Sequence, residues 1–380
     1  MFKRTVDFGM ILALSLFALM PAACERDDTD NDRFPATTTT IAETTTSTTT
    51  TTVSVTFEKV KDITVIPDDT FENGGYFSRI FQKNEGGFFV TFQTDQPDPG
   101  TDFGYKDYTE DLAETGSSGI FRNAQSCDYA AAFSGDFYYF CSIDMETGFM
   151  DLVKYDRDWR EVKQVAVELE DNEVGYDQML ALVNNRLILS SFVEPDGVPD
   201  ANLGGATYHY LYGTDLEFEQ KMILDDTMHI NGASMTFVDD VYYYVSSTSY
   251  FGDIIIMKYD TSWNYLGSQT IMPEGQWPQG VAYEDGLFYV AYLDHTTRPS
   301  QNAVLAVFDT DWNLLGNVKI TDFLPPDTPD PEEYPQAGRP WVIVKDGKAY
   351  VAYDQRVVVE EGPSLNPECH VTVFDIVVNR

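Results

Sequence analysis

Alternating apolar and polar residues recur along most of this chain, each time after a short turn. The stretches DGLFYVAY at 285–292 and DGKAYVAY at 346–353 are nearly the same, and weaker versions begin near Gly86, Gly135, Asn185 and Asp240. A turn of this kind followed by alternating Tyr, Phe and Val predicts a hairpin that enters a strand. The hairpins recur every 46 to 61 residues or so, which is typical of four-stranded propeller blades.

A second phrase keeps the same spacing, one strand further on. It reads KYDRDWREV, LYGTDLEFE, KYDTSWNYL and VFDTDWNLL, with a degenerate version, DFGYKDYTEDL, near Tyr105. The Asp side chain can bond to the backbone two residues on, so we expect a tight turn after which a Trp or Leu begins the fourth strand. Because these residues recur from blade to blade, we interpret them as turn caps and packing between blades.

The two ends of the repeat region complement each other. The last repeat lacks a fourth strand, while VTFEKVKDITVI at 55–66 belongs to no repeat. Pairing this stretch beside the final strand would close the ring and leave no exposed sheet edge. The sequence therefore predicts an all-β fold, a six-bladed β-propeller of four-stranded blades in residues 54–380, whose N-terminal strand completes the last blade.

The first 53 residues do not fit this fold. Lys3 and Arg4 precede an apolar run, and Pro21-Ala22-Ala23 follows it, which predicts a secretory signal at 1–23. Cys24 is then a candidate for lipidation, although cleavage without a lipid, giving a secreted or periplasmic protein, stays open. Residues 24–53 are acidic and then Thr-rich, with Thr at twelve of the sixteen positions from 37 to 52, and predict an extended linker.

Net charge limits the classes of binding partner that we expect, and the cysteine positions predict a disulfide. The formal net charge is -38, from 62 acidic and 24 basic residues, so nucleic acid is excluded as a bulk electrostatic partner and a membrane is expected only through the N-terminal lipid. No cofactor is identified; no D-x-D-x-D-G loop occurs, yet calcium stays open beside a solvated acidic shell. Cys127 and Cys141 flank one hairpin and predict a disulfide, which leaves Cys369 unpaired. We expect a monomer.

The longest connections are expected on one face of the ring, where second strands join third strands and blade joins blade. Binding residues gather on such loops, so this face is the candidate functional surface. Counting seven or eight residues back from each hairpin places a row of side chains at the mouth of the central channel, with aromatic residues nearby that could stack on a ligand. The candidate ligand-binding residues are Arg79, Gln178, Gln279, Arg339, Tyr76, Tyr176 and Trp277.

The same row offers candidate chemistry. Asp128 and Asp177 come from adjacent blades and could act as the paired carboxylates of acid–base catalysis, or they could pair with Arg79 and Arg339 in a wet channel. The four histidines also map to this face, with His229 and His295 as the weak candidates for metal ligands. Isolated surface histidines are the alternative interpretation.

The DG-x-x-YVAY hairpins, the FDTDWNLLG turns and the closing strand together resemble six-bladed β-propellers of extracytoplasmic bacterial proteins, many of which are lipoproteins. This resemblance covers residues 54–380 and implies the fold, because propellers host hydrolases, lyases, lectins and scaffolds alike. Our first hypothesis is a tethered or secreted module that binds a carbohydrate, peptide or protein on its loop-rich face. The alternatives are a polysaccharide hydrolase or lyase, and a metal-dependent hydrolase.

Overall fold

The computed structural model describes the residues after the Thr-rich stretch, with gaps. They are 53–66, 75–95, 101–124, 129–143, 150–167, 169, 173–195, 206–223, 234–248, 252–272, 276–297, 299–325, 332–359 and 365–379. The chain divides into two units at Thr52, and all of these residues belong to the second unit. The predicted signal, Cys24 and the linker lie outside the described residues. Among the described residues, no helix has the length and apolar character needed to cross a membrane.

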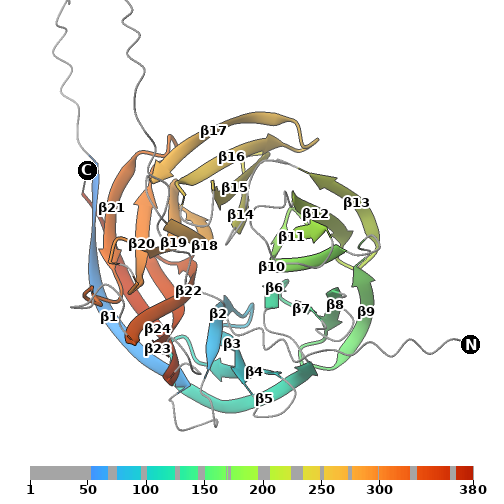
Figure 1. Ribbon diagram of the computed structural model, residues 1–380, viewed down its shortest axis with the longest axis horizontal. Coiled ribbons are helices and arrows are strands. Elements are labelled where there is room, and N and C mark those ends of the chain that lie inside the picture. Colours follow the sequence, from blue (N-terminus) through green and yellow to red (C-terminus); the bar gives the residue numbers. More distant parts are fainter. Residues whose placement is uncertain are drawn as a thin grey trace, which may run out of the picture. The chain divides into compact units, whose positions relative to one another are not determined.

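The second unit is a six-bladed β-propeller, as predicted (Figure 1). Each blade is a four-stranded antiparallel sheet. Blades 1, 2 and 3 consist of β2 (Tyr76–Gln82), β3 (Phe88–Asp95), β4 (Thr101–Tyr108) and β5 (Glu114–Ala124); β6 (Tyr129–Phe133), β7 (Tyr138–Ile143), β8 (Met150–Tyr155) and β9 (Glu161–Val167); and β10 (Glu173–Val183), β11 (Arg186–Pro195), β12 (Ala206–Gly213) and β13 (Phe218–Ile223).

The remaining three blades complete the ring. They consist of β14 (Ser234–Val238), β15 (Val241–Ser247), β16 (Ile254–Asp260) and β17 (Tyr265–Met272); β18 (Gln276–Glu284), β19 (Leu287–Asp294), β20 (Asn302–Phe308) and β21 (Leu314–Lys319); and β22 (Glu333–Lys345), β23 (Lys348–Val359), β24 (Leu365–Asn379) and β1 (Ser54–Ile66). The first strand of each blade lies innermost and the fourth lies at the rim (Figure 1).

The N-terminal strand closes the ring, which confirms the sequence prediction. β1 pairs antiparallel with β24 from Ser54 opposite Asn379 to Ile66 opposite Cys369, so it is the outermost strand of blade 6. Figure 1 shows β1 at the rim beside β24, although the two strands lie at opposite ends of the chain. Backbone hydrogen bonds between the two ends therefore replace an exposed sheet edge.

Apolar residues fill the spaces between neighbouring blades. Each pair of neighbours shares at least one buried cluster. The cluster between blades 4 and 5, for example, joins Ile254 and Ile256 of β16 to Phe288 and Val290 of β19. Alternation along every strand sends successive side chains to the two neighbouring interfaces, so both faces of each sheet are covered. This explains why central strands such as β20 are buried at every position.

The Trp-containing turns anchor these interfaces. In blades 1 to 5 the turn between the third and fourth strands carries a bulky residue with positive φ, namely Leu112, Trp159, Leu216, Trp263 and Trp312. A left-handed conformation costs roughly 1–2 kcal/mol for such a residue, so packing must hold it. Each of the three Trp side chains stacks on an aromatic residue of the second strand, as Trp312 does on Phe288, with 4.2 Å between ring centroids.

Two details of the predicted turn phrase were wrong. The Trp or Leu lies within the turn, two residues before the fourth strand, as Trp312 does before Leu314. The capping residue also varies. Asp309 Oδ1 accepts hydrogen bonds from the N–H groups of Asp311 at 2.9 Å and Asn313 at 2.8 Å, whereas blade 3 has Gly213 at this position. The fold therefore requires the buried bulky residue more strictly than the cap.

Hairpin turns on the face opposite the long connections link blade to blade. The Glu284 carboxylate of blade 5 accepts hydrogen bonds from the N–H groups of Asp346 at 3.0 Å and Gly347 at 3.1 Å in the blade 6 hairpin. Lys345 of blade 6 pairs with Glu110 of blade 1 at 2.7 Å. Exposed ion pairs contribute little to stability, so these contacts fix the orientation of blades that the apolar clusters already hold.

We expect Trp312→Ala to lower the free energy of unfolding by roughly 3–5 kcal/mol, because the substitution leaves a cavity between blades 4 and 5. Trp312→Leu should cost less, since Leu occupies the same turn position in blades 1 and 3. Denaturant unfolding of both variants measures this. Leu324→Ala is the control, because that side chain is 74% exposed. Equal losses for Ala and Leu at position 312 would contradict the packing role.

Candidate functional site

Four of the six innermost strands have an irregularity where the sequence placed the channel mouth. Pairing of the first strand with the second is interrupted between Tyr76 and Arg79, between Tyr176 and Met179, between Pro278 and Gly280, and between Gly338 and Trp341. A bulge bends a strand and redirects its side chains, and bulges are common beside functional sites. Strict alternation of side chains along the first strand therefore fails in these four blades.

The predicted ligand-binding residues are only partly within the described structure. Arg79, Tyr76 and Gln279 are buried, and Arg339 is half-buried. The backbones of Tyr176, Asp177, Gln178 and Trp277 lie in β10 and β18, but their side chains lie outside the described residues, as do Asp128, Cys127 and His229. The pairing of Asp128 with Asp177 and the disulfide from Cys127 to Cys141 therefore stay predictions. Cys141 is buried in β7.

The structure adds a fully buried carboxylate that sequence reasoning missed, Asp354 of β23. Its Oδ1 accepts a hydrogen bond from the Phe77 N–H at 2.9 Å, so it joins blade 6 to the first strand of blade 1. The carboxyl group packs directly on Gly338, where an added Cβ would lie 2.1 Å from Oδ2. A signal was present in the sequence, since DQR follows YVAY directly in this hairpin and places charges at the end of a buried strand.

Three arginines lie near this junction of blades 6 and 1, each against an aromatic ring. Arg339 Cζ lies 4.4 Å from the ring centroid of Phe77, and Arg356 Cζ lies 5.5 Å from that of Tyr76. Arg79 Cζ lies 4.7 Å from the centroid of the Trp341 ring. Trp341 follows Arg339 by two residues in β22. Packing against a ring holds a guanidinium plane in a defined orientation.

Burial and charge act on Asp354 in opposite directions. Loss of hydration raises the pKa of the Asp354 carboxyl above its ordinary value of 3.8. The positive charges of Arg356 and Arg339 and the hydrogen bond from Phe77 oppose this rise in pKa. Cys369 lies on the adjacent strand, and burial raises the pKa of its thiol, so the thiol is neutral. Asp354, Arg339 and Arg356 are called the Asp354 cluster below.

Neutral polar side chains border the Asp354 cluster. The Nε and Nη2 atoms of Arg356 donate hydrogen bonds to Gln336 Oε1 at 3.2 and 2.9 Å. Gln336 is 5% exposed, and Gln279 of the neighbouring inner strand is 6% exposed. β18 meets β22 closely here, because a Cβ added at Gly280 would lie 2.8 Å from Val342 N. The two buried amides thus lie on the adjacent inner strands β18 and β22, and Arg339 lies on β22 with Gln336.

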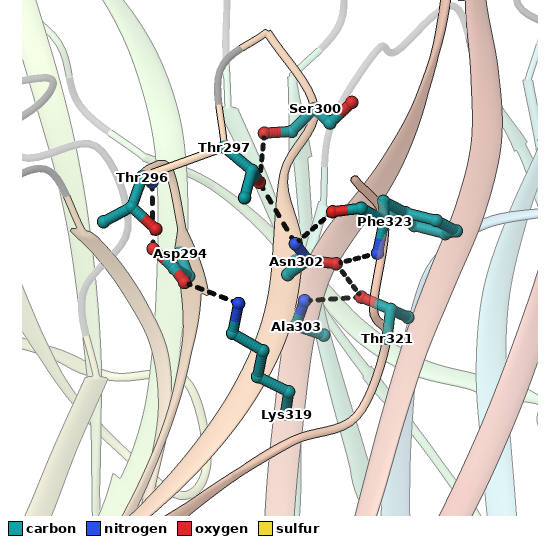
Figure 2. A network of polar contacts seen from close by, with 9 residues as sticks. All are labelled: Asp294, Thr296, Thr297, Ser300, Asn302, Ala303, Lys319, Thr321 and Phe323. Carbon is teal, nitrogen blue, oxygen red and sulfur yellow. Dashed lines mark hydrogen bonds and ion pairs between the residues drawn. The ribbon is translucent and has the colours of Figure 1, made fainter. Parts of the chain in front are cut away.

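Blade 5 contains a hydrogen-bonded network of polar side chains beside β22, the strand that carries Arg339. Figure 2 shows this network. The Asn302 side chain accepts from Phe323 N at 2.7 Å and Thr321 Oγ1 at 3.1 Å, and donates to Thr297 Oγ1 at 3.1 Å. This ties the connection after β19 to the segment after β21. The Gln301 carbonyl then accepts from Ala337 N at 2.9 Å, across to blade 6.

The described histidines do not converge. His209, His295 and His370 belong to blades 3, 5 and 6, and no three His, Cys, Asp or Glu side chains within the described ranges form a group that could hold a metal ion. His209 is 1% exposed, its Nδ1 lies 2.6 Å from Ser190 Oγ, and burial lowers its pKa to about 3. His370 contacts Glu368 at 3.1 Å and stacks on Tyr353.

Comparisons with known proteins agree with the fold and extend no further. No family model matches the chain, and no curated protein matches it. Among solved structures, a protein of unknown function from Dyadobacter fermentans is 12% identical, with a TM-score of 0.60, over 84% of this chain and 99% of that one. A subtype N10 neuraminidase-like protein of A/little yellow-shouldered bat/Guatemala is 10% identical, with a TM-score of 0.50, over 85% and 99%. At these identities the likeness is one of fold.

We expect His209 to make stability depend on pH. Its pKa is about 3 in the folded protein and near 6.5 in the unfolded chain, so between these values the unfolded state binds the extra proton. The free energy of unfolding should therefore fall as pH falls through this window, by at most about 1.4 kcal/mol per pH unit. Urea unfolding of the native protein and His209→Gln measures this. A stability difference that is constant with pH would contradict it.

Proposed function

We propose that this propeller is a binding module whose loop-rich face holds a saccharide that carries a carboxylate. The observation that carries the proposal is the Asp354 cluster, in which Arg339 and Arg356 lie near one buried carboxyl group in a protein of net charge -38. Burying charge is costly unless it is paired, and guanidinium groups at the mouth of the channel suit an anion.

The chemistry of the neighbouring groups favours an acidic sugar over a simple anion. A guanidinium held against a ring presents its N–H edge in the geometry that a carboxylate accepts, often with two parallel hydrogen bonds. Gln279 and Gln336 supply amide groups, which donate to and accept from hydroxyl groups. A ligand with one carboxylate and several hydroxyls, such as a uronate residue, would use both kinds of group.

The remaining hypotheses concern the setting of the module. We keep secretion through residues 1–23 and tethering through a lipid on Cys24 as proposals, supported by the sequence pattern and by a Thr-rich linker that would hold the propeller away from a surface. Cleavage of the bound saccharide by Asp128 and Asp177 also stays a proposal.

We expect digalacturonate to bind the protein and raise its melting temperature, because a ligand of the native state stabilises that state. Arg339→Gln should weaken this binding roughly tenfold to a hundredfold, since a charged hydrogen bond to the carboxylate is lost. Calorimetric titration measures the affinity, and analysis of the saccharide after incubation reports any cleavage.

The matched control is Arg160→Gln, whose side chain is 75% exposed in a turn between third and fourth strands. This variant should bind digalacturonate as the native protein does, and the neutral disaccharide of galactose should bind neither form appreciably. Equal binding of the charged and the neutral disaccharide would overturn an acid-specific site.

The tethering proposal is tested in a bacterium that attaches lipids to exported cysteines. We expect the native protein to incorporate labelled palmitate and to sediment with membranes, and Cys24→Ser to do neither. Membrane association of the Cys24→Ser variant without label would show that the anchor is not a lipid on Cys24.

A further inference from the structure

Arg356 carries a positive charge that forms no ion pair with a carboxylate of the described residues. Its guanidinium group donates hydrogen bonds from Nε at 3.2 Å and from Nη2 at 2.9 Å, and both go to the neutral amide oxygen of Gln336. Asp354 lies two residues earlier in β23, but its Oδ1 accepts from the Phe77 N–H, and its Oδ2 has no hydrogen bond within the described structure. In a protein of net charge -38, Arg356 is thus bonded to an amide instead of a carboxylate.

Glu368 of the neighbouring strand β24 is bonded to other side chains. It lies opposite Gln355, the residue before Arg356, in the pairing of β23 with β24. Its Oε2 accepts a hydrogen bond from Gln355 Nε2 at 2.9 Å and lies 3.1 Å from His370 Nε2. Glu368 therefore does not neutralise Arg356.

The hydrogen bonds to Gln336 use one edge of the Arg356 guanidinium group and leave another. Nε–H and one N–H of Nη2 point along the same edge of this planar group, and Gln336 Oε1 accepts from both. The other N–H of Nη2 and one N–H of Nη1 form a second parallel pair, which matches the two oxygens of a carboxylate. Arg356 is half-buried, and none of its atoms is among the buried polar atoms of the described residues that lack a partner, so this second edge reaches solvent.

Two buried side chains hold the guanidinium group in place. Gln336 is 5% exposed, and its backbone forms a β-bridge with Gln301 of blade 5, beside the hydrogen bond from Ala337 N to the Gln301 carbonyl. The ring centroid of Tyr76 in blade 1, which is 6% exposed, lies 5.5 Å from Arg356 Cζ. A side chain that is already held loses little freedom when a ligand binds to it.

We infer that Arg356 receives the ligand carboxylate on its second edge and that Gln336 is its positioning residue, because a neutral acceptor orients the guanidinium group and leaves its charge to the ligand. This inference rests on the proposed function and names the guanidinium group that binds the acidic sugar. A carboxylate at position 336 would accept the same hydrogen bonds but would neutralise Arg356. The amide of Gln336 therefore makes the site selective for an anionic ligand.

Calorimetric titration of the whole protein with digalacturonate at constant ionic strength tests this. Gln336→Glu keeps the size of the side chain and its acceptor oxygen. We expect it to lower the affinity at least about tenfold, because the new carboxylate pairs with Arg356 and repels the ligand. The matched control is Gln164→Glu, which adds the same charge at an exposed position of the rim strand β9 and should bind as the native protein does. Equal affinities of the native protein and a folded Gln336→Glu variant would overturn the inference.

Gln336→Met gives a second measurement, which also serves if Gln336→Glu does not fold. It removes the acceptor without adding charge, so the affinity should fall roughly twofold to tenfold as the guanidinium group loses its anchor. In an Arg356→Met background the same substitution should change the affinity less than about twofold, because Gln336 acts through Arg356. The same loss in both backgrounds would mean that Gln336 is merely structural, which contradicts the inference.

Arg356→Met alone separates the inference from the proposed function. We expect this variant to bind digalacturonate roughly tenfold to a hundredfold more weakly than the native protein, because charged hydrogen bonds to the carboxylate are lost. Native affinity in Arg356→Met, with weaker binding in Arg339→Gln, would overturn the inference and leave the proposed function standing. No binding of digalacturonate by the native protein would overturn both.

Discussion

The structure depends on the pairing of β1 with β24. Each blade is a sheet with two apolar faces, and neither face can be buried unless a blade lies on each side of it, so the ring must close. The antiparallel ladder from Ser54 to Ile66 accomplishes this with hydrogen bonds between the two ends of the unit. It also places Val55 in the cluster between blades 5 and 6 and Ile66 in the cluster between blades 6 and 1. One strand therefore completes two interfaces.

The closed ring has two faces with different structural features. On one face, short turns carry Trp and Leu residues in left-handed conformations and link neighbouring blades by polar contacts. These features constrain the ring and leave little freedom for binding. On the other face the strands of blade 6 are long, with 13 residues in β22 and 12 in β23, and they carry Arg339, Asp354 and Arg356 at the junction with blade 1.

This junction is where the structure departs from a simple apolar interface. Between the other strands of blades 6 and 1, residues such as Val90 and Tyr350 pack as expected. Toward the loop-rich face the same interface accepts a buried carboxyl group, bulged inner strands and arginines held on rings. Such groups reduce stability unless they are paired, and their concentration in one place is the physical reason to look for a ligand there.

The sequence by itself determined the architecture, because alternation, turn residues and a regular period are local properties that each blade repeats. It also predicted which strand closes the ring, because the last blade lacks a fourth strand and residues 55–66 form a strand that belongs to no other blade. It placed Arg79, Gln279 and Arg339 on inner strands for the same reason, although Arg339 lies in the middle of β22 and not at its start. It did not find Asp354. Phe77, Gly338 and the two arginines near this carboxyl group come from three strands, which come together only in the folded ring. Bulges, burial and the balance of charge are properties of tertiary contacts, and only the structure could decide them.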